Sequence, residues 1–294
     1  MTFNDNVTID TSSVSKRSGG ARRGGVAVGG GLGIALLLFI GSQLLGVDLT
    51  GLAPVLGGGG GTSSEQEVAL ADCKTGADAN ADAECRMAAT ADSLNRYWAS
   101  QVGNYRKPAP VVLFDGATQS GCGTASAQTG PFYCPPEERI YVDVAFFDTL
   151  RDRYGASDGT LVEMYVLAHE WGHHISNLIG TIDQAGRESG ASSGSVRLEL
   201  QADCFAGAWV GAAQKVTDDR GVPFLKPITN AQIRDALSAA AAVGDDHIME
   251  TSGMRVNPDN FTHGTSEQRQ RWFMTGYEKG PTFCGTFDVP ASQL

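Results

Sequence analysis

His169-Glu170-Trp171-Gly172-His173 is the stretch around which the 294-residue chain is organised. A helix turns about 100° per residue, so the two histidines, four positions apart, lie on the same helix face. Two imidazoles in this arrangement can bind one Zn²⁺, and the glutamate beside them can accept a proton from water at the open position of the metal. Because the chain has only 5 histidines, a chance match to this pattern is expected roughly 0.005 times.

The residues around the motif predict a buried helix from Leu161 to Gly180. Apolar residues recur along this run with helical spacing, which favours packing against a core. Gly180 is typical of a residue that follows the end of a helix. The alternative is a helix that carries two unrelated histidines.

A hydrolytic zinc site needs a third protein ligand and an open position for water. The longer pattern H-E-x-x-H-x-x-G-x-x-H is excluded, because Ser176 and Ile179 stand where its glycine and last histidine would be. Glu199 is the candidate ligand, and Asp203 lies four residues later on the same face of a predicted helix. We expect Asp203 to accept the N–H of one histidine ligand and so fix its orientation. The alternative for Glu199 is an exposed carboxylate paired with Arg197.

The chain resembles the neutral zinc metallopeptidase family of bacterial membrane-anchored proteins, within the gluzincin clan. Five stretches carry the resemblance in the order of the family: Gly130–Pro135, His169–His173, Glu199–Gly207, Gly244–Asp246 and His263–Arg269. The resemblance implies Zn²⁺ bound by His169, His173 and Glu199, with Glu170 catalytic. It implies no particular substrate.

The first 64 residues predict a tail, a membrane span and a linker. Residues 25–47 contain no charged residue, and 23 residues at 1.5 Å each cross about 30 Å of hydrocarbon. The polar tail 1–24 is expected to be disordered and cytoplasmic, because positive residues stay inside. Its basic residues just before the span are Lys16, Arg17, Arg22 and Arg23. A Gly/Ser-rich linker, 48–64, would then lead to an extracytoplasmic domain, 65–294.

A cleaved signal peptide is the alternative to this uncleaved anchor, but it would have a shorter apolar core. Gly25, Gly29 and Gly33 have the spacing that lets two spans pair, so a dimer through the span is a further hypothesis. The expected fold class is α+β, with a single-pass membrane anchor followed by one helix-rich, gluzincin-like domain that contains a small sheet. The formal net charge of −11 argues against nucleic acid as a partner.

The six cysteines all follow the predicted span, and their even number fits disulfide pairing. Six cysteines allow fifteen connectivities. The two equal spacings favour local bridges between Cys73 and Cys85 and between Cys122 and Cys134, which leaves Cys204 with Cys284. The chain has no C-x-x-C, so a cysteine zinc site has little support.

The rest of the domain predicts a mixed architecture. A helix is expected over Ala88–Val102, with strands at Pro110–Phe114 and Arg139–Val144. The second strand is our candidate for an edge that pairs with an extended substrate, and an internal strand is the alternative. Two later helices, Thr229–Val243 and Thr265–Tyr277, each begin with a capping box.

Two histidines lie beside these later helices and could reach the metal site. An oxyanion needs a donor in addition to the metal, and His263 is our first candidate. His247 is the second candidate, and structural hydrogen bonding is the alternative for both. His174 projects about 100° away from His173, so it is expected to pack or to face solvent.

Together these residues predict a zinc-dependent peptidase that hydrolyses bonds in a peptide or protein substrate, with Glu170 taking a proton from water. One alternative is a protein that binds peptides on a metalloprotease scaffold without cutting them. Another is a zinc amidase that acts on cell-wall peptides.

Overall fold

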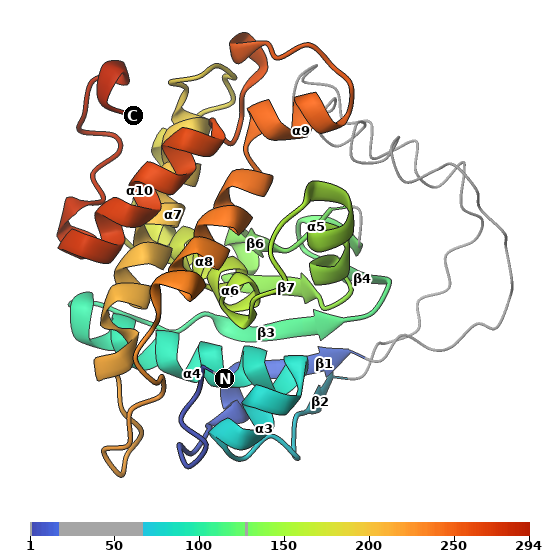
Figure 1. The fold of residues 1–294 in the computed structure, drawn as a ribbon, viewed down its shortest axis with the longest axis vertical. Helices are drawn as coiled ribbons and strands as arrows, with labels where there is room; N and C mark the ends of the chain where they lie inside the picture. The colour runs from blue at the N-terminus through green and yellow to red at the C-terminus, as the bar shows by residue number, and fades with distance from the viewer. Residues whose placement is uncertain (1, 18–66, 127–128) are drawn as a thin grey trace, which may run out of the picture.

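The computed structural model describes residues 2–17, 67–126 and 129–294 as an α+β fold (Figure 1). The strands are β1 (Val14–Arg17), β2 (Glu67–Ala69), β3 (Ala109–Phe114), β4 (Ala117–Ser120), β5 (Gly123–Ser126), β6 (Phe132–Cys134) and β7 (Arg139–Asp143). The helices are α3 (Gly76–Ala81), α4 (Ala83–Gln101), α5 (Phe146–Tyr154), α6 (Thr160–Leu178), α7 (Gly194–Ala212), α8 (Asn230–Ala242), α9 (Asp245–Thr251) and α10 (Ser266–Lys279).

The main sheet has the strand order β2-β1-β3-β7-β6. β1, β3 and β7 are parallel, while β2 and β6 are antiparallel to their neighbours. β7 pairs with a strand on each side, so our expectation that Arg139–Val144 forms an edge is wrong. The sequence pattern predicted the strand, but it cannot tell an internal strand from an edge. β6 is the edge strand on this side of the sheet.

The two faces of the sheet bury different side chains because successive residues of a strand point in opposite directions. Val111 and Leu113 belong to the large core beneath the helices, whereas Val112 and Phe114 belong to a smaller cluster on the other face. Ala125 of the β4–β5 hairpin also belongs to the smaller cluster. The residues of β3 from Val111 to Phe114 are therefore buried on both faces of the sheet.

The helices α4 and α6 pack against the sheet, and the other large helices pack on α6 or behind it. α4 contacts β1 and α6, and α6 contacts β6 and β7. α7 packs on α6, and α10 packs along α7; in Figure 1, α7, α8 and α10 stand together beside α6. The capping boxes predicted at Thr229 and Thr265 are present at the starts of α8 and α10. The motif helix ends at Leu178, and Gly180 follows in the left-handed region with φ +77.

Residues 2–17 form part of the folded domain, so a disordered tail over this stretch is wrong. β1 lies inside the sheet between β2 and β3, with Ser15 opposite Val112. Phe3 and Val7 are fully buried in the large core. The domain therefore does not begin at residue 65, because it takes an interior strand from the first 17 residues.

The predicted single-pass membrane anchor is also wrong. Among residues 2–17, 67–126 and 129–294, no helix has the length and apolar character that a bilayer span requires. The predicted span 25–47, with its glycines and the linker 48–64, lies outside the described residues. A single crossing would put β1 and β2 on opposite sides of a membrane, whereas Arg17 lies opposite Glu67 in one sheet. The expected topology, with a cytoplasmic N-terminus and an extracytoplasmic domain, is therefore not retained.

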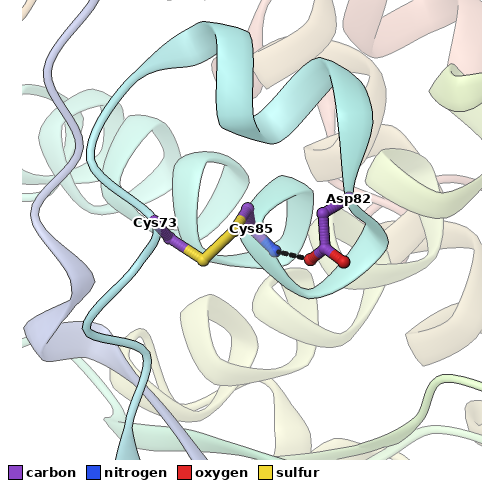
Figure 2. A group of neighbouring side chains, drawn as sticks. All are labelled: Cys73, Asp82 and Cys85. Carbon is purple, nitrogen blue, oxygen red and sulfur yellow. Dashed lines mark hydrogen bonds between the residues drawn. A yellow bond between two sulfur atoms is a disulfide. The ribbon is translucent and has the colours of Figure 1, made fainter.

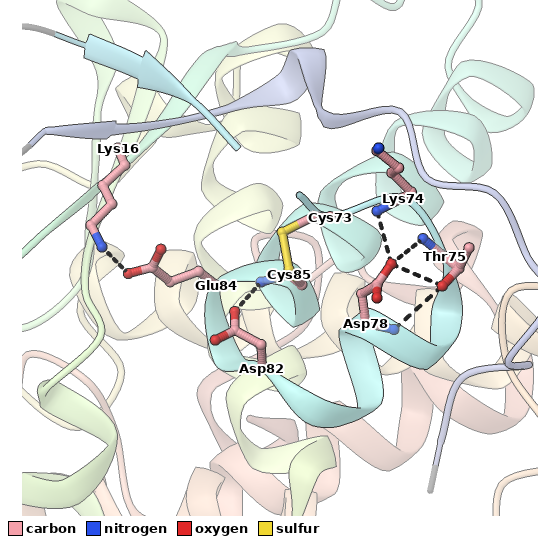
Figure 3. Close-up of a disulfide and its surroundings, with 8 residues drawn as sticks. All are labelled: Lys16, Cys73, Lys74, Thr75, Asp78, Asp82, Glu84 and Cys85. Atoms are coloured by element: carbon pink, nitrogen blue, oxygen red, sulfur yellow. Dashed lines mark hydrogen bonds and ion pairs between the residues drawn. A yellow bond between two sulfur atoms is a disulfide. The ribbon is translucent and has the colours of Figure 1, made fainter. Parts of the chain in front are cut away.

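Two of the basic residues read as a topology signal are held by acidic partners within the domain. Lys16 Nζ lies 2.5 Å from a carboxylate oxygen of Glu84 on α4 (Figure 3). Arg17 Nη2 lies 2.9 Å from an oxygen of Glu67 on β2. These ion pairs join β1 to α4 and to β2. A count of positive charges before an apolar run cannot predict such pairs.

The predicted cysteine pairing is confirmed in all three bridges, Cys73–Cys85, Cys122–Cys134 and Cys204–Cys284. Figure 2 shows the first bridge at the start of α4, where Asp82 caps the helix by accepting the N–H of Cys85. The paired cysteines of the three bridges are separated by 12, 12 and 80 residues in the sequence. In the chain-entropy model, loops of these sizes stabilise the fold by about 3 kcal/mol for each short one and about 4.5 kcal/mol for the long one.

Replacing Phe3 with Ala tests whether the first residues belong to the core. The change removes a ring with 0% exposure, so it should lower the free energy of unfolding by about 3–5 kcal/mol. Denaturant unfolding followed by circular dichroism measures the loss. Asn6→Ala is the matched control, because Asn6 is exposed and the change should stay within about 0.5 kcal/mol. Equal stability of the two variants would contradict the position of this segment.

Candidate metal centre

The site forms where α6 and α7 approach each other closely. Gly172, inside the histidine motif, faces the backbone of Ala202 on α7. A Cβ atom at Gly172 would lie 2.8 Å from both the Cα and the carbonyl oxygen of Ala202, closer than a real Cβ tolerates. The glycine therefore allows the backbone of the motif helix to come near the helix that carries Glu199.

This approach brings together the three residues predicted as metal ligands. His169 Nε2 lies 3.2 Å from Oε2 of Glu199, and His173 Nε2 lies 3.3 Å from its Oε1. One donor atom from each of the three residues lies within 4.8 Å of the others. Two imidazole nitrogens and a carboxylate oxygen are a donor set that suits Zn²⁺ with one position open. The residues present therefore fit the ion.

The charges around His169 favour a cation at this place. Burial disfavours protonated His169, but the charge and hydrogen bonds of Asp203 and Glu199 outweigh burial and raise the pKa of His169 to about 10. Burial opposes ionisation of Glu199 too, yet the neighbouring His173 and His169 hold its pKa well below the ordinary value. The negative charges of Asp203 and Glu199 that favour protonated His169 also favour a divalent cation at the same place.

Asp203 orients one of the ligands, as its spacing predicted. Its Oδ1 lies 2.8 Å from Nδ1 of His169, so the imidazole donates there and turns Nε2 toward Glu199. The carboxylate is fully buried, and it also accepts from Arg269 and Tyr165. Sequence reasoning did not assign these two partners. Tyr165 is four residues before His169 on the same helix face, a spacing that could have drawn attention to it.

Glu170 follows His169 on α6 and is buried, with 7% exposure. Burial is the largest effect on its carboxyl group and raises the pKa of Glu170, while the charges of His173 and His169 oppose the rise. A carboxyl group whose pKa is shifted toward neutrality is suited to take up and return a proton.

His263 is held by Asp245 at the N-terminus of α9. Asp245 Oδ2 accepts the backbone N–H groups of Thr262, His263 and Gly264 at 2.8, 2.6 and 2.9 Å. Its Oδ1 lies 3.2 Å from Nδ1 of His263. Burial disfavours protonated His263, but the bond to Asp245 and the negative charge of Glu199 raise the pKa of His263. Asp245 thus holds the half-buried imidazole of His263 in place, and the negative charge of Glu199 favours its protonated form.

The other two histidines make structural contacts. His247 lies in α9 rather than in a loop, and its Nε2 lies 2.9 Å from the carbonyl oxygen of Tyr154. His174 is fully buried, with Nδ1 at 3.0 Å from the Tyr133 hydroxyl and Nε2 at 2.8 Å from the Arg106 carbonyl oxygen. Of the two expectations for His174, packing and exposure to solvent, the structure shows packing.

A second group of potential ligands, Cys73, Asp82 and Cys85, has another role. The two sulfur atoms are bonded to each other, and Asp82 caps α4 (Figure 2). In Figure 3 the same bridge lies beside the Thr75–Asp78 capping box of α3. A disulfide sulfur is not the thiolate that binds metals, so this cluster is structural.

Comparison with known proteins agrees with the site. The family model described as "Putative neutral zinc metallopeptidase" matches residues 2–287. The chain belongs to this family. The family match begins at residue 2, in keeping with the place of β1 inside the domain.

Two relatives cover most of the chain. The "Uncharacterized protein Rv2575" of Mycobacterium tuberculosis H37Rv is 44% identical over 302 residues, which cover 98% of this chain and 99% of the relative. The "Uncharacterized protein YpfJ" of Escherichia coli K12 is 37% identical over 265 residues, which cover 88% and 86%. No solved structure matches the chain.

Gly172→Ala tests the helix contact on which the site depends. The new methyl group must push α6 away from Ala202, so we expect a loss of about 1–3 kcal/mol in stability together with weaker zinc binding. Thermal unfolding and chelator competition measure the two effects. Gly103→Ala is the control, because a Cβ there meets nothing within 4 Å. Unchanged zinc affinity in Gly172→Ala would show that the site does not need this approach.

Proposed function

We propose that the protein is a zinc-dependent peptidase of the gluzincin type, with zinc bound by His169, His173 and Glu199. The observation that carries the proposal is the convergence of these three donors, within 4.8 Å of one another, from the two helices α6 and α7. When bound, Zn²⁺ supplies a Lewis acid that polarises a carbonyl group and makes water more acidic. Membership in a zinc metallopeptidase family supports this chemistry.

Glu170 is the proposed general base. It follows a ligand in the sequence of α6, and its raised pKa lets it take a proton from the attacking water and return it to the leaving amine. General acid–base catalysis by one positioned group contributes typically about 10²–10⁴-fold to a rate. Its carboxylate therefore carries the proton through both halves of the reaction.

His263 is the proposed donor to the oxygen of the scissile carbonyl. Asp245 holds its Nδ1 side and leaves Nε2 as the ring nitrogen that can donate to substrate. The hydrogen bond with Asp245 favours the protonated form of this imidazole and so raises the pKa of His263. A positioned cation beside the carbonyl stabilises the negative charge that develops there.

The proposed substrate is an extended peptide that adds to the edge of the sheet at β6. Within the described part of the chain, β6 pairs with β7 on one side only. Tyr133 of β6 ties this edge to the motif helix, because its hydroxyl contacts His174 and accepts from Asn177 at 2.9 Å. Backbone pairing along such an edge aligns a peptide without strong sequence choice.

Glu170→Gln separates catalysis from metal binding. The amide keeps the size of the side chain but cannot accept a proton, so peptide hydrolysis should fall by about 10²–10⁴-fold while zinc content stays at the parent level. Glu199→Ala is the paired variant and should lose zinc, together with the rise in melting temperature that zinc gives the parent. Hydrolysis of a peptide library and metal analysis provide the readouts. A parent protein that binds zinc and peptides without cutting them would support a binding protein instead.

The Asp245–His263 pair gives a prediction for pH dependence. The proposed donor acts when protonated, so kcat/KM should fall as pH rises through the pKa of His263. Asp245→Asn removes the charge that raises this pKa, and the alkaline fall should then move to lower pH. Rate profiles from pH 5 to 10 measure the shift. Asp259→Asn, an exposed control, should leave the profile in place, and an unmoved profile in Asp245→Asn would remove His263 from this role.

A further inference from the structure

The buried carboxylate of Asp203 has a partner that the proposed chemistry has not used. Arg269 on α10 has 2% exposure, and its Nε and Nη2 donate to the two oxygens of Asp203 at 2.7 and 3.0 Å. This two-pronged contact fixes a carboxylate in direction as well as in position. The same carboxylate accepts from Nδ1 of His169.

Arg269, on α10, contacts groups from three other helices. Its Nη1 donates to the carbonyl oxygen of Val243, at the end of α8, at 3.1 Å. Its Nη2 lies 3.9 Å from Oε2 of Glu199 on α7. The Tyr165 hydroxyl, on α6, donates to Oδ1 of Asp203 at 2.5 Å. The guanidinium thus fixes Asp203 relative to both helices that supply ligands.

The energetics show why Asp203 requires such a partner. A fully buried carboxylate is costly unless a charge and hydrogen bonds compensate it. In the zinc-bound site His169 would be a neutral ligand, so the N–H of His169 and the hydroxyl of Tyr165 would leave the negative charge of Asp203 without a cation. Arg269 supplies that cation and holds the carboxylate where His169 can donate to it.

We propose that Arg269 is a positioning residue of the metal site, which acts through Asp203 to hold His169 in the orientation that binds zinc. The proposal deepens the function above and rests on its zinc site. Arg269 contacts the orienting carboxylate, and its Nη2 also lies 3.3 Å from Nδ1 of the ligand His169. Its effect should therefore show in zinc affinity even when no peptide is present.

A double-mutant cycle separates this role from a general contribution to the fold. Arg269→Gln should weaken zinc affinity by about 10- to 100-fold, the range seen when partners of metal ligands are lost. If Arg269 acts through Asp203, the same change in the Asp203→Asn background should have less than about a threefold effect. Competition with a chromophoric chelator gives the dissociation constants for Zn²⁺ alone.

Arg271→Gln is the matched control on the same helix. Arg271 is two residues further on, and its guanidinium donates to the carbonyl oxygen of Leu294. This variant should keep the zinc affinity of the parent. Should Arg269→Gln fail to fold, Arg269→Lys and Tyr165→Phe replace it in the same cycle. The Lys keeps the charge without the fork, and the Phe removes one donor to Asp203.

The double-mutant cycle has three possible outcomes. An Arg269 effect that disappears in the Asp203→Asn background supports the proposal. Equal effects in the two backgrounds, or an Arg269→Gln protein with parental zinc affinity, would overturn it while leaving the zinc site intact. A parent protein without stoichiometric zinc would overturn the proposed function itself.

Discussion

The contact between Gly172 and the backbone of Ala202 is the constraint on which the site depends. Histidines four apart on one helix make half of a metal site, and the third donor has to arrive from a second helix. Helix axes usually lie 8–10 Å apart, at a distance set by the side chains between them. With no side chain at Gly172, α7 can come close enough for Glu199 to reach both imidazoles.

A similar close approach repeats one layer further out, between α7 and α10. A Cβ on Gly276 would lie 1.8 Å from the carbonyl oxygen of Cys204, which only glycine avoids. α10 therefore lies directly against the ligand helix, and this is how Arg269 comes to reach Asp203. The disulfide from Cys204 to Cys284 joins the same part of α7 to the C-terminal segment. Packing outside the site thus fixes the groups inside it.

The parts that sequence could predict are those encoded over short distances. Helical spacing placed His169 with His173 and Glu199 with Asp203, and loop spacing gave the disulfide pairs. The contact of Arg269 with Asp203 was not predicted, because the two residues are 66 positions apart and lie on different helices. The strand β1 was not predicted for the same reason, because its parallel partner β3 lies about 100 residues later in the sequence. The apolar run at 25–47 then made the first residues look like a tail outside the domain.

The pairing of β1 with β2 places Arg17 opposite Glu67, so the residues that flank positions 18–66 lie next to each other in one sheet. Pairing two segments of a chain in this way fixes the two ends of the intervening stretch next to each other. The entropy of closing such a loop grows with the logarithm of its length, by about 0.6 kcal/mol for each doubling. On this estimate, a change in the number of residues between β1 and β2 should alter the closure entropy by only a small amount. Because β1 and β2 are antiparallel and adjacent, a short hairpin turn is the kind of connection that can join them directly.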